Sequence, residues 1–385
     1  MKMSEYDQAG QKINNIDIKI EYELYSFSRN MINICFQQGD KHKVCERMKN
    51  MKKIALAIAT TSILGVSAST QAAVNVCVFD LLGKSGESYK MMQDWALAAK
   101  SWGADVNLQA ITDEQVADNN FKAGKCDAVA MTAMRARPYN KFAGSIDSLG
   151  GAPSNEIAQR AITYVLDARN AAKMTTNLGG NKYEIGGIAP LGAAYIFVRD
   201  KSISSIEKAA GKKFAVLGHD DAQKIMVQRV GAQAVLSDIS NFAAKFNNGQ
   251  VDMVGAPAYA YKPLELSKGL GANGAMFNFP VLQVTADLVL RPEKFPAGFG
   301  QKSRDYFVKQ LPKSFAMIKR YEAEIPAKYK MNLSAEDKLK YQKLMRDGRM
   351  DLTKRGIYDA GMMSVLKKAR CSVDKANFEC ALPGE

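Results

Sequence analysis

Residues 74–132, VNVCVFDLLGKSGESYKMMQDWALAAKSWGADVNLQAITDEQVADNNFKAGKCDAVAMT, alternate between strand-forming and helix-forming patterns. The β-branched and apolar run 74–82 is typical of a buried strand, and 105–111 alternates polar and apolar residues like a half-buried one. A third apolar run, 126–132, predicts another strand. Strands that alternate with helices indicate an α/β fold with a parallel sheet.

Two helices are expected between these strands. Residues 88–102 carry apolar side chains at helical spacing and stop at Gly103. Residues 112–115 (TDEQ) form a capping box that opens a second helix ending at Gly124. In a common doubly wound order the first strand lies between the second and the third. We therefore expect the first and third strands to be neighbours.

The same pattern returns further along the chain. Residues 204–207 (SSIE) form another capping box, and 218–221 (GHDD) indicate a loop into a helix that ends near Gly231. The other elements of this second unit are a strand at 211–217, a short strand at 234–236, a helix at 239–248 and a closing strand at 250–256. Two such units predict two doubly wound lobes that face each other across a cleft.

Long segments connect and follow the two units. Residues 183–199 (YEIGGIAPLGAAYIFVR) suit a strand passing from one lobe to the other, and 283–290 (QVTADLVL) suit a return strand. We expect one long helix over 156–178 and a basic, helical region from 301 to 370. The predicted organisation is lobe 1 over 73–195, lobe 2 over 196–285, and a return to lobe 1 with C-terminal helices over 286–385.

Residues 51–72 have the layout of a secretory signal peptide. Lys52 and Lys53 precede the apolar run 54–66 (IALAIATTSILGV), and small residues follow, with an A-x-A-like cleavage site just after Ala72. The run is too short to cross a bilayer, which takes about 20 apolar residues. The alternative is a buried helix of a cytosolic domain, although such a helix rarely combines paired lysines with a cleavage pattern. The sequence predicts export to the periplasm.

Residues 1–50 precede that segment and show no fold pattern. We interpret them as a mis-annotated extension, with translation starting at Met48 or Met51, and the alternative is an authentic long leader. Removal of residues 1–72 leaves 313 residues, enough for two medium-sized domains, with a formal charge of +11.

Four of the six cysteines follow the predicted cleavage site: Cys77, Cys126, Cys371 and Cys380. An even number of cysteines in an exported chain indicates disulfides, because the periplasm is oxidising. Four cysteines allow three connectivities. We favour Cys77–Cys126, which neighbouring first and third strands would allow, and Cys371–Cys380. The alternative, a metal site, lacks a CxxC spacing and a nearby histidine. No metal or cofactor is expected.

Ligands of open α/β sheets bind outside the carboxyl ends of the strands. After the first strand this rule selects Asp80 and Ser85, where residues 84–87 could present backbone N–H groups to an anion. An ordinary strand–helix turn is the alternative. The loop is not a phosphate-binding P-loop, because the upstream glycine spacing is missing.

Four residues are selected after the third strand: Thr132, Arg135, Arg137 and Ser145. Two arginines in one loop can clamp a carboxylate or a phosphate. Alternatively, they hold the loop at Pro138. Ser145 could add a hydroxyl contact or simply form a turn.

In the second lobe the rule selects His219, Asp220, Pro257 and Tyr259. One histidine beside acidic residues is a weak metal pattern, and capping of the following helix explains the acids. Pro257 and Tyr259 could stack on a ligand or line the interface between the lobes.

Three segments resemble the TRAP-transporter periplasmic solute-binding proteins of the DctP-like family. Residues 201–213 (KSISSIEKAAGKK), 229–232 (RVGA) and 242–252 (FAAKFNNGQVD) resemble that family's capped helix with its "GLK", its "LGA" turn and its "ALQTGVVDG" stretch. The likeness covers most of 74–300 and implies a type II periplasmic-binding-protein fold that closes on its ligand. TRAP proteins usually carry an arginine two residues after "GLK" that pairs with a substrate carboxylate. The matching residue is Ala215, which puts an organic-acid ligand in doubt.

Along most of its length the chain also resembles a narrower, AdeT-like group of solute-binding proteins. Members of that group have been labelled RND-type efflux components linked to aminoglycoside resistance. An RND pump must span the membrane many times, and the sequence has no spanning run after residue 72. An accessory role beside an efflux pump is the alternative to solute delivery.

The positive charge concentrates in the C-terminal region, at Lys313, Lys319, Arg320, Lys328, Lys330, Lys338 and Lys340. Such a surface could attract anionic lipids or an acidic partner, or it could be a solvated helix face. No recognised nucleic-acid-binding motif occurs. After residue 72, one histidine and four expected disulfide cysteines leave little material for catalysis, so no enzyme activity is expected. The predicted function is capture of a small solute, with an anion as one candidate, for a membrane transporter.

Overall fold

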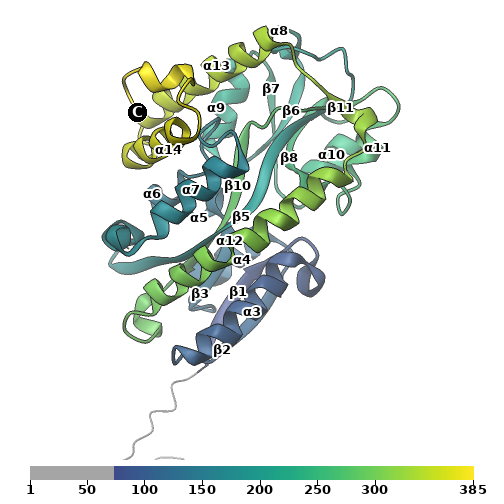
Figure 1. The fold of residues 1–385 in the computed structure, drawn as a ribbon. Coiled ribbons are helices and arrows are strands. Elements are labelled where there is room, and N and C mark those ends of the chain that lie inside the picture. The colour runs from purple at the N-terminus through teal and green to yellow at the C-terminus, as the bar shows by residue number, and fades with distance from the viewer. Residues whose placement is uncertain (1–72) are drawn as a thin grey trace, which may run out of the picture. The chain divides into compact units, whose positions relative to one another are not determined.

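The first α/β unit follows the predicted order of strands and helices. The computed structural model describes residues 73–385, which belong to one compact unit. The first α/β unit contains β1 (Val74–Phe79), α3 (Glu87–Ser101), β2 (Val106–Ile111), α4 (Glu114–Lys122) and β3 (Ala128–Thr132). β1 pairs in parallel with β2 on one side and with β3 on the other, so the predicted strand order is confirmed (Figure 1).

The second α/β unit repeats this arrangement. It contains α8 (Ile206–Ala209), β6 (Lys213–Leu217), α9 (Asp221–Arg229), β7 (Gln233–Ser237), α10 (Phe242–Asn247) and β8 (Met253–Pro257). β6 pairs in parallel with β7 and with β8. Short elements follow each unit. After β3 come α5 (Ala133–Ala136) and α6 (Lys141–Gly144), and after β8 come α11 (Leu266–Leu270) and β9 (Ala275–Phe277).

Two long antiparallel strands join the α/β units. β5 (Asn181–Val198) pairs with β10 (Leu282–Leu290). In lobe 1 β10 also pairs with β3, and in lobe 2 β5 also pairs with β8. The resulting strand order is β2-β1-β3-β10-β5-β8-β6-β7. The two crossing strands predicted from the sequence are therefore confirmed.

The helix α12 (Phe299–Glu324) lies along β5 and reaches both lobes (Figure 1). Its Ile318 belongs to the hydrophobic core of lobe 1, whereas Ile325, directly after the helix, belongs to a core cluster of lobe 2. Gly187 of β5 permits the close approach, because a Cβ there would lie 2.0 Å from the ring of Phe307.

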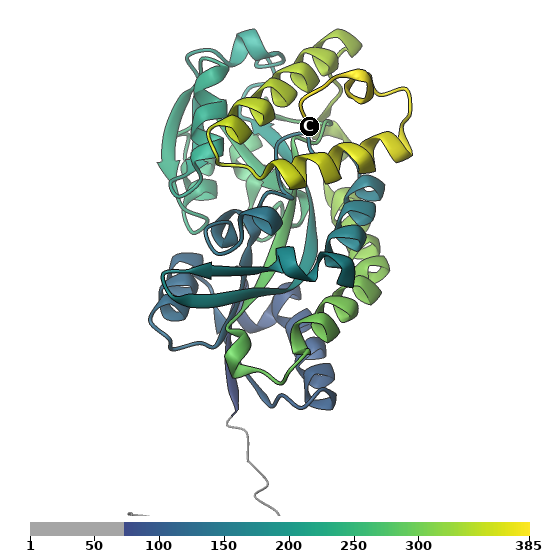
Figure 2. The ribbon, with the colours of Figure 1, turned by 90° about the vertical axis from the view of Figure 1, so that its left-hand side faces the viewer.

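Two further helices close the chain, α13 (Ala335–Lys354) and α14 (Ala360–Val373). Met345 of α13 packs in a core cluster of lobe 2, and Leu352 packs in the core of lobe 1. α14 packs against α7 (Asn155–Leu166) of lobe 1 (Figure 2). The predicted helical region from 301 to 370 thus falls into three helices, interrupted by β11 (Lys330–Met331).

The prediction of one helix over 156–178 is wrong beyond Leu166. The chain turns extended at Asp167, whose carboxylate accepts a hydrogen bond from the backbone N–H of Arg169. A 3-10 helix, η2 (Ala168–Met174), and the strand β4 (Thr175–Leu178) follow, and β4 pairs with β5. The side-chain hydrogen bond of Asp167 competes with continuation of the helix.

Both predicted capping boxes differ from the observed helix starts. Asp113, not Thr112, caps α4 by accepting the backbone N–H of Val116. Ser205 occupies the N-cap of α8 but makes no side-chain capping hydrogen bond.

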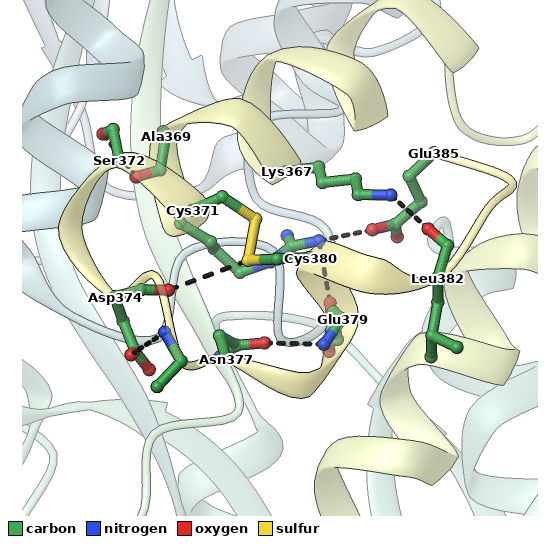
Figure 3. The surroundings of a disulfide bond; sticks show 12 residues. Lys367, Ala369, Cys371, Ser372, Asp374, Asn377, Glu379, Cys380, Leu382 and Glu385 are labelled. Carbon is green, nitrogen blue, oxygen red and sulfur yellow. Dashed lines mark hydrogen bonds and ion pairs between the residues drawn. A yellow bond between two sulfur atoms is a disulfide. The ribbon is translucent and has the colours of Figure 1, made fainter.

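Both favoured disulfides are confirmed. Cys77 of β1 bonds Cys126 just before β3, with 5.8 Å between the Cα atoms. The bond is possible because β1 and β3 are neighbours. Cys371 bonds Cys380 and ties the C-terminal segment to α14, with 5.7 Å between the Cα atoms (Figure 3).

The predictions for residues 1–50 and for the signal peptide at 51–72 lie outside the described residues. Within residues 73–385, no helix combines the length and the apolar character needed to cross a membrane.

Candidate ligand-binding site

Two adjoining cavities lie where the carboxyl ends of the strands of the two lobes meet. The larger has a volume of about 190 Å³ and is bordered by Met134 of lobe 1 and Leu217 of lobe 2. The smaller has a volume of about 90 Å³. Leu81, Thr132 and Tyr259 border both cavities. This is the place where open α/β sheets bind ligands.

The walls of the larger cavity are apolar. Among the described residues that line it, none carries a charge, and the polar side chains are those of Thr132, Gln223, Tyr259 and Tyr341. Ala215 of β6 is part of this wall. The apolar wall comes from both lobes and from α13, and includes Met134, Leu217, Met226, Phe242, Val284 and Met345.

Asp80 follows β1 and borders the smaller cavity. Its carboxylate accepts the backbone N–H groups of Leu82 at 2.9 Å and Tyr89 at 3.1 Å. The carboxylate therefore occupies the N-terminal end of α3, where the sequence suggested an anion site. Ser85, in the 3-10 helix η1 (Gly83–Ser85), is exposed and borders neither cavity.

Arg135 is held inside lobe 1 rather than aimed at a cavity. Its Nε donates to Glu114 Oε2 at 3.3 Å and its Nη1 donates to Gln115 Oε1 at 2.7 Å. Glu114 also accepts the backbone N–H of Thr132 at 2.7 Å. Burial raises the pKa of Glu114, and the contacts from Thr132 and Arg135 offset only part of that rise. Arg135 borders neither cavity.

Arg137 links the two lobes. Its guanidinium donates to Asp147 of lobe 1 at 2.9 Å, to the Gly144 carbonyl at 2.8 Å, and to Asp220 of lobe 2 at 3.0 Å. Asp220 is also the N-cap of α9. Burial lowers the pKa of Arg137, but Asp147 and Asp220 raise it further, so the guanidinium stays charged. Arg137 and Asp220 border neither cavity.

Two buried carboxyl groups lie near this link. Burial raises the pKa of Asp147 to about 6, against the opposing effect of Arg137. Asp287 of β10 is fully buried, and neither oxygen of its carboxyl group has a hydrogen-bond partner among the described residues. Burial and then the charge of Asp147 raise the pKa of Asp287 well above its usual value.

Ser145 and His219 also border neither cavity. The Ser145 hydroxyl donates to the Lys141 carbonyl and accepts the backbone N–H of Asp359, which joins α6 to the start of α14. Neither ring nitrogen of His219 has a hydrogen-bond partner among the described residues. Burial and then Arg135 lower the pKa of His219 to about 4, so the ring is neutral. Residues 73–385 contain no cluster of three potential metal ligands.

The structure thus separates the sequence-selected residues into two groups. Asp80, Thr132, Pro257 and Tyr259 border the cavities. Ser85, Arg135, Arg137, Ser145, His219 and Asp220 do not. Met134 and Leu217 border the larger cavity but were not predicted, although both lie at the strand ends that the topological rule selects. In the sequence, an apolar residue at a strand end looks the same as a core residue.

Comparison with known proteins assigns the chain to a family. Residues 37–385 match the model of the solute-binding protein AdeT 1/2 family. The chain belongs to this family. It is 47% identical over 308 residues to the probable solute-binding protein AdeT1 of Acinetobacter baumannii, which covers 80% of this chain and 100% of that relative. It is 30% identical over 239 residues to the probable solute-binding protein AdeT2 of the same organism, covering 62% and 99% of the two chains.

Solved structures of TRAP periplasmic solute-binding proteins share the fold. One from Desulfovibrio salexigens, with bound orotic acid, has a TM-score of 0.63 at 13% identity and covers 78% of this chain and 99% of that one. One from Shewanella oneidensis, with bound succinate, has a TM-score of 0.59 at 13% identity, covering 77% and 99%. The type II periplasmic-binding-protein fold is therefore confirmed. The matched family is one of solute-binding proteins, not of enzymes.

Proposed function

We propose that the chain is a periplasmic receptor that captures a small solute in the larger cavity and delivers it to a membrane transporter. The observation that carries this proposal is that both lobes build the cavity wall. Met134 and Leu149 come from lobe 1, and Leu217 and Phe242 come from lobe 2. A solute held between them contacts both lobes, so its binding energy favours an arrangement in which the lobes stay together.

The connections between the lobes suit a closing movement. The pairing of β10 with β5 shifts register between Val284 and Thr285, next to the cavity. Such irregularities bend a strand and weaken its pairing locally. We place the hinge at this irregularity, with α12 and α13 as the helices that span the two lobes.

The periplasmic location rests on the predicted signal peptide at 51–72, and the periplasmic structural neighbours support it. Cell fractionation with N-terminal sequencing should find a mature chain that begins at or near Ala73. An unprocessed polypeptide recovered from the cytosol would contradict the proposed location.

Two sequence-based hypotheses stay outside this proposal. The basic C-terminal surface is partly neutralised, because Lys313 pairs with Asp94 and Lys340 pairs with Glu336. Binding to anionic lipid remains a prediction from sequence.

The matched relatives are named for solute binding and not for efflux, so the accessory efflux role also remains a hypothesis.

Filling the cavity should abolish ligand binding. Leu217 ends β6 and borders the cavity, whereas Leu97 of α3 is 75% exposed. A library of organic acids, amino acids, sugars, polyamines and neutral aromatics is screened by thermal shift, since a ligand stabilises the folded state by mass action. A hit should raise the melting temperature of the wild type and of Leu97→Trp but not of Leu217→Trp. Equal shifts in all three proteins, or no hit for the wild type, would contradict the proposal.

A further inference from the structure

We propose that the solute is an uncharged, largely apolar molecule that carries one or two hydrogen-bond acceptors. This inference rests on the proposed function and names the ligand class of the larger cavity. No charged residue is found among the described residues that line this cavity. A charge buried there would have no counter-charge in the wall, and burial of an unpaired charge is strongly unfavourable.

The arginines that could have bound an anion are engaged elsewhere. Arg135 is buried against Glu114, and Arg137 is buried between Asp147 and Asp220. Ala215, which lines the cavity, carries no charge. The cavity therefore has no positively charged side chain that could compensate a carboxylate for its lost hydration.

The apolar wall is large and adaptable. Four methionines contribute to it: Met134, Met226, Met253 and Met345. Their unbranched thioether side chains adjust to ligands of different outline. The volume of about 190 Å³ exceeds the ~150 Å³ of an apolar protein cavity that accepts benzene. A ligand with one aromatic ring and a small substituent fits this space.

Two side chains can orient such a ligand through hydrogen bonds. The Gln223 Oε1 accepts the backbone N–H of Leu217 at 3.1 Å, which fixes the amide in place. Its Nε2 is 3.1 Å from the Met134 sulfur. A thioether is a weak acceptor, so a ligand oxygen can replace it. Burial and then Asp80 raise the pKa of Tyr259, so its hydroxyl remains protonated and can donate as well.

A matched series of ligands tests the charge preference on the purified protein. Acetophenone, benzoate and benzylammonium share one ring but are neutral, anionic and cationic. Isothermal titration calorimetry should show acetophenone binding, with both ions at least about 100-fold weaker because their charges stay unpaired. Benzoate or benzylammonium binding as tightly as acetophenone would overturn the inference, as would no acetophenone binding at about 1 mM.

Substitutions in the wall locate the effect. Ala215→Arg should weaken acetophenone binding and strengthen benzoate binding, whereas Leu236→Arg on the neighbouring strand β7, at a position 58% exposed, should change neither. Gln223→Met is a second variant that changes the wall less, and circular dichroism checks that it folds. It should weaken acetophenone about 10-fold, the equivalent of one hydrogen bond, and leave toluene binding unchanged.

The outcomes separate the two proposals. A preference for benzoate that Leu217→Trp abolishes would overturn the neutral-ligand inference and leave the binding function standing. Acetophenone binding that neither Leu217→Trp nor Gln223→Met alters would contradict both, because the ligand would then sit elsewhere.

Discussion

His219 and Asp147 have pKa values shifted in opposite directions. The pKa of His219 falls from 6.5 to about 4, so the folded state disfavours its protonation. His219 therefore contributes stability that is present above pH 6.5 and is lost as the pH falls through 4. The pKa of Asp147 rises from 3.8 to about 6. Asp147 therefore contributes stability that is present below pH 3.8 and is lost as the pH rises through 6.

Single substitutions should separate these opposing contributions. As the pH rises from 4 to 6.5, the free energy of unfolding of His219→Gln should fall by about 2 kcal/mol relative to wild type, because the variant lacks the stability that His219 adds over this range. This value is reduced for the partial exposure of the ring. Over the same range, the free energy of unfolding of Asp147→Asn should rise by about 2 kcal/mol relative to wild type, because the variant lacks the group whose stabilising effect is lost there. Urea unfolding at several pH values measures both. The exposed Glu336→Gln serves as control. Difference curves that are flat for both variants would show that neither group titrates as described.

At the scale of elements, a buried ion cluster fixes α13 and α14 to the C-terminal segment. Arg349 of α13 is fully buried and donates to Glu379 at 2.5 Å and to Glu385 at 2.6 Å. Arg370 of α14 pairs with the same two carboxylates. Burial raises the pKa of Glu385, but Arg349 and Arg370 more than offset this, so its pKa is lowered.

Removal of one buried arginine should leave the carboxylates without a full complement of partners. We expect Arg349→Met to lower the free energy of unfolding by about 3–5 kcal/mol. Arg355→Met, which removes an exposed pair with Asp351 at the end of the same helix, should cost less than about 1 kcal/mol. Urea denaturation compares the two variants, and equal losses would refute the assignment of stability to the cluster.

Secondary-structure elements were easier to predict from the sequence than the residues of the ligand-binding site. Strand and helix patterns are local, so both α/β units and both crossing strands followed from periodicity. The helix predicted over 156–178 ends at Leu166, because the side chain of Asp167 accepts the backbone N–H of Arg169. Site contacts depend on remote partners. No local pattern shows that Arg137 meets Asp220, and apolar cavity walls resemble core positions in a sequence.

At the scale of the whole molecule, Arg137 makes a direct ion pair between the two lobes. It donates to Asp220 of lobe 2 while Asp147 holds it in lobe 1. The strands β5 and β10 and the helices α12 and α13 also connect the lobes, and Ala222 and Met226 of α9 pack in the core cluster of lobe 1. A change in the Arg137–Asp220 contact should therefore alter the balance between open and closed lobes with little effect on the fold of either lobe.

Asp220→Asn tests this balance, because asparagine can still cap α9 while the ion pair is lost. We expect a larger radius of gyration without ligand in small-angle X-ray scattering. Ligand affinity should fall about 10-fold, since the ligand must then supply the energy that the ion pair contributed to closure. The neighbouring Asp221→Asn, which removes only an exposed pair with Lys224, should change neither quantity. If Asp220→Asn bound ligand as tightly as Asp221→Asn, the Arg137–Asp220 contact would stabilise the folded structure between the lobes without affecting their closure.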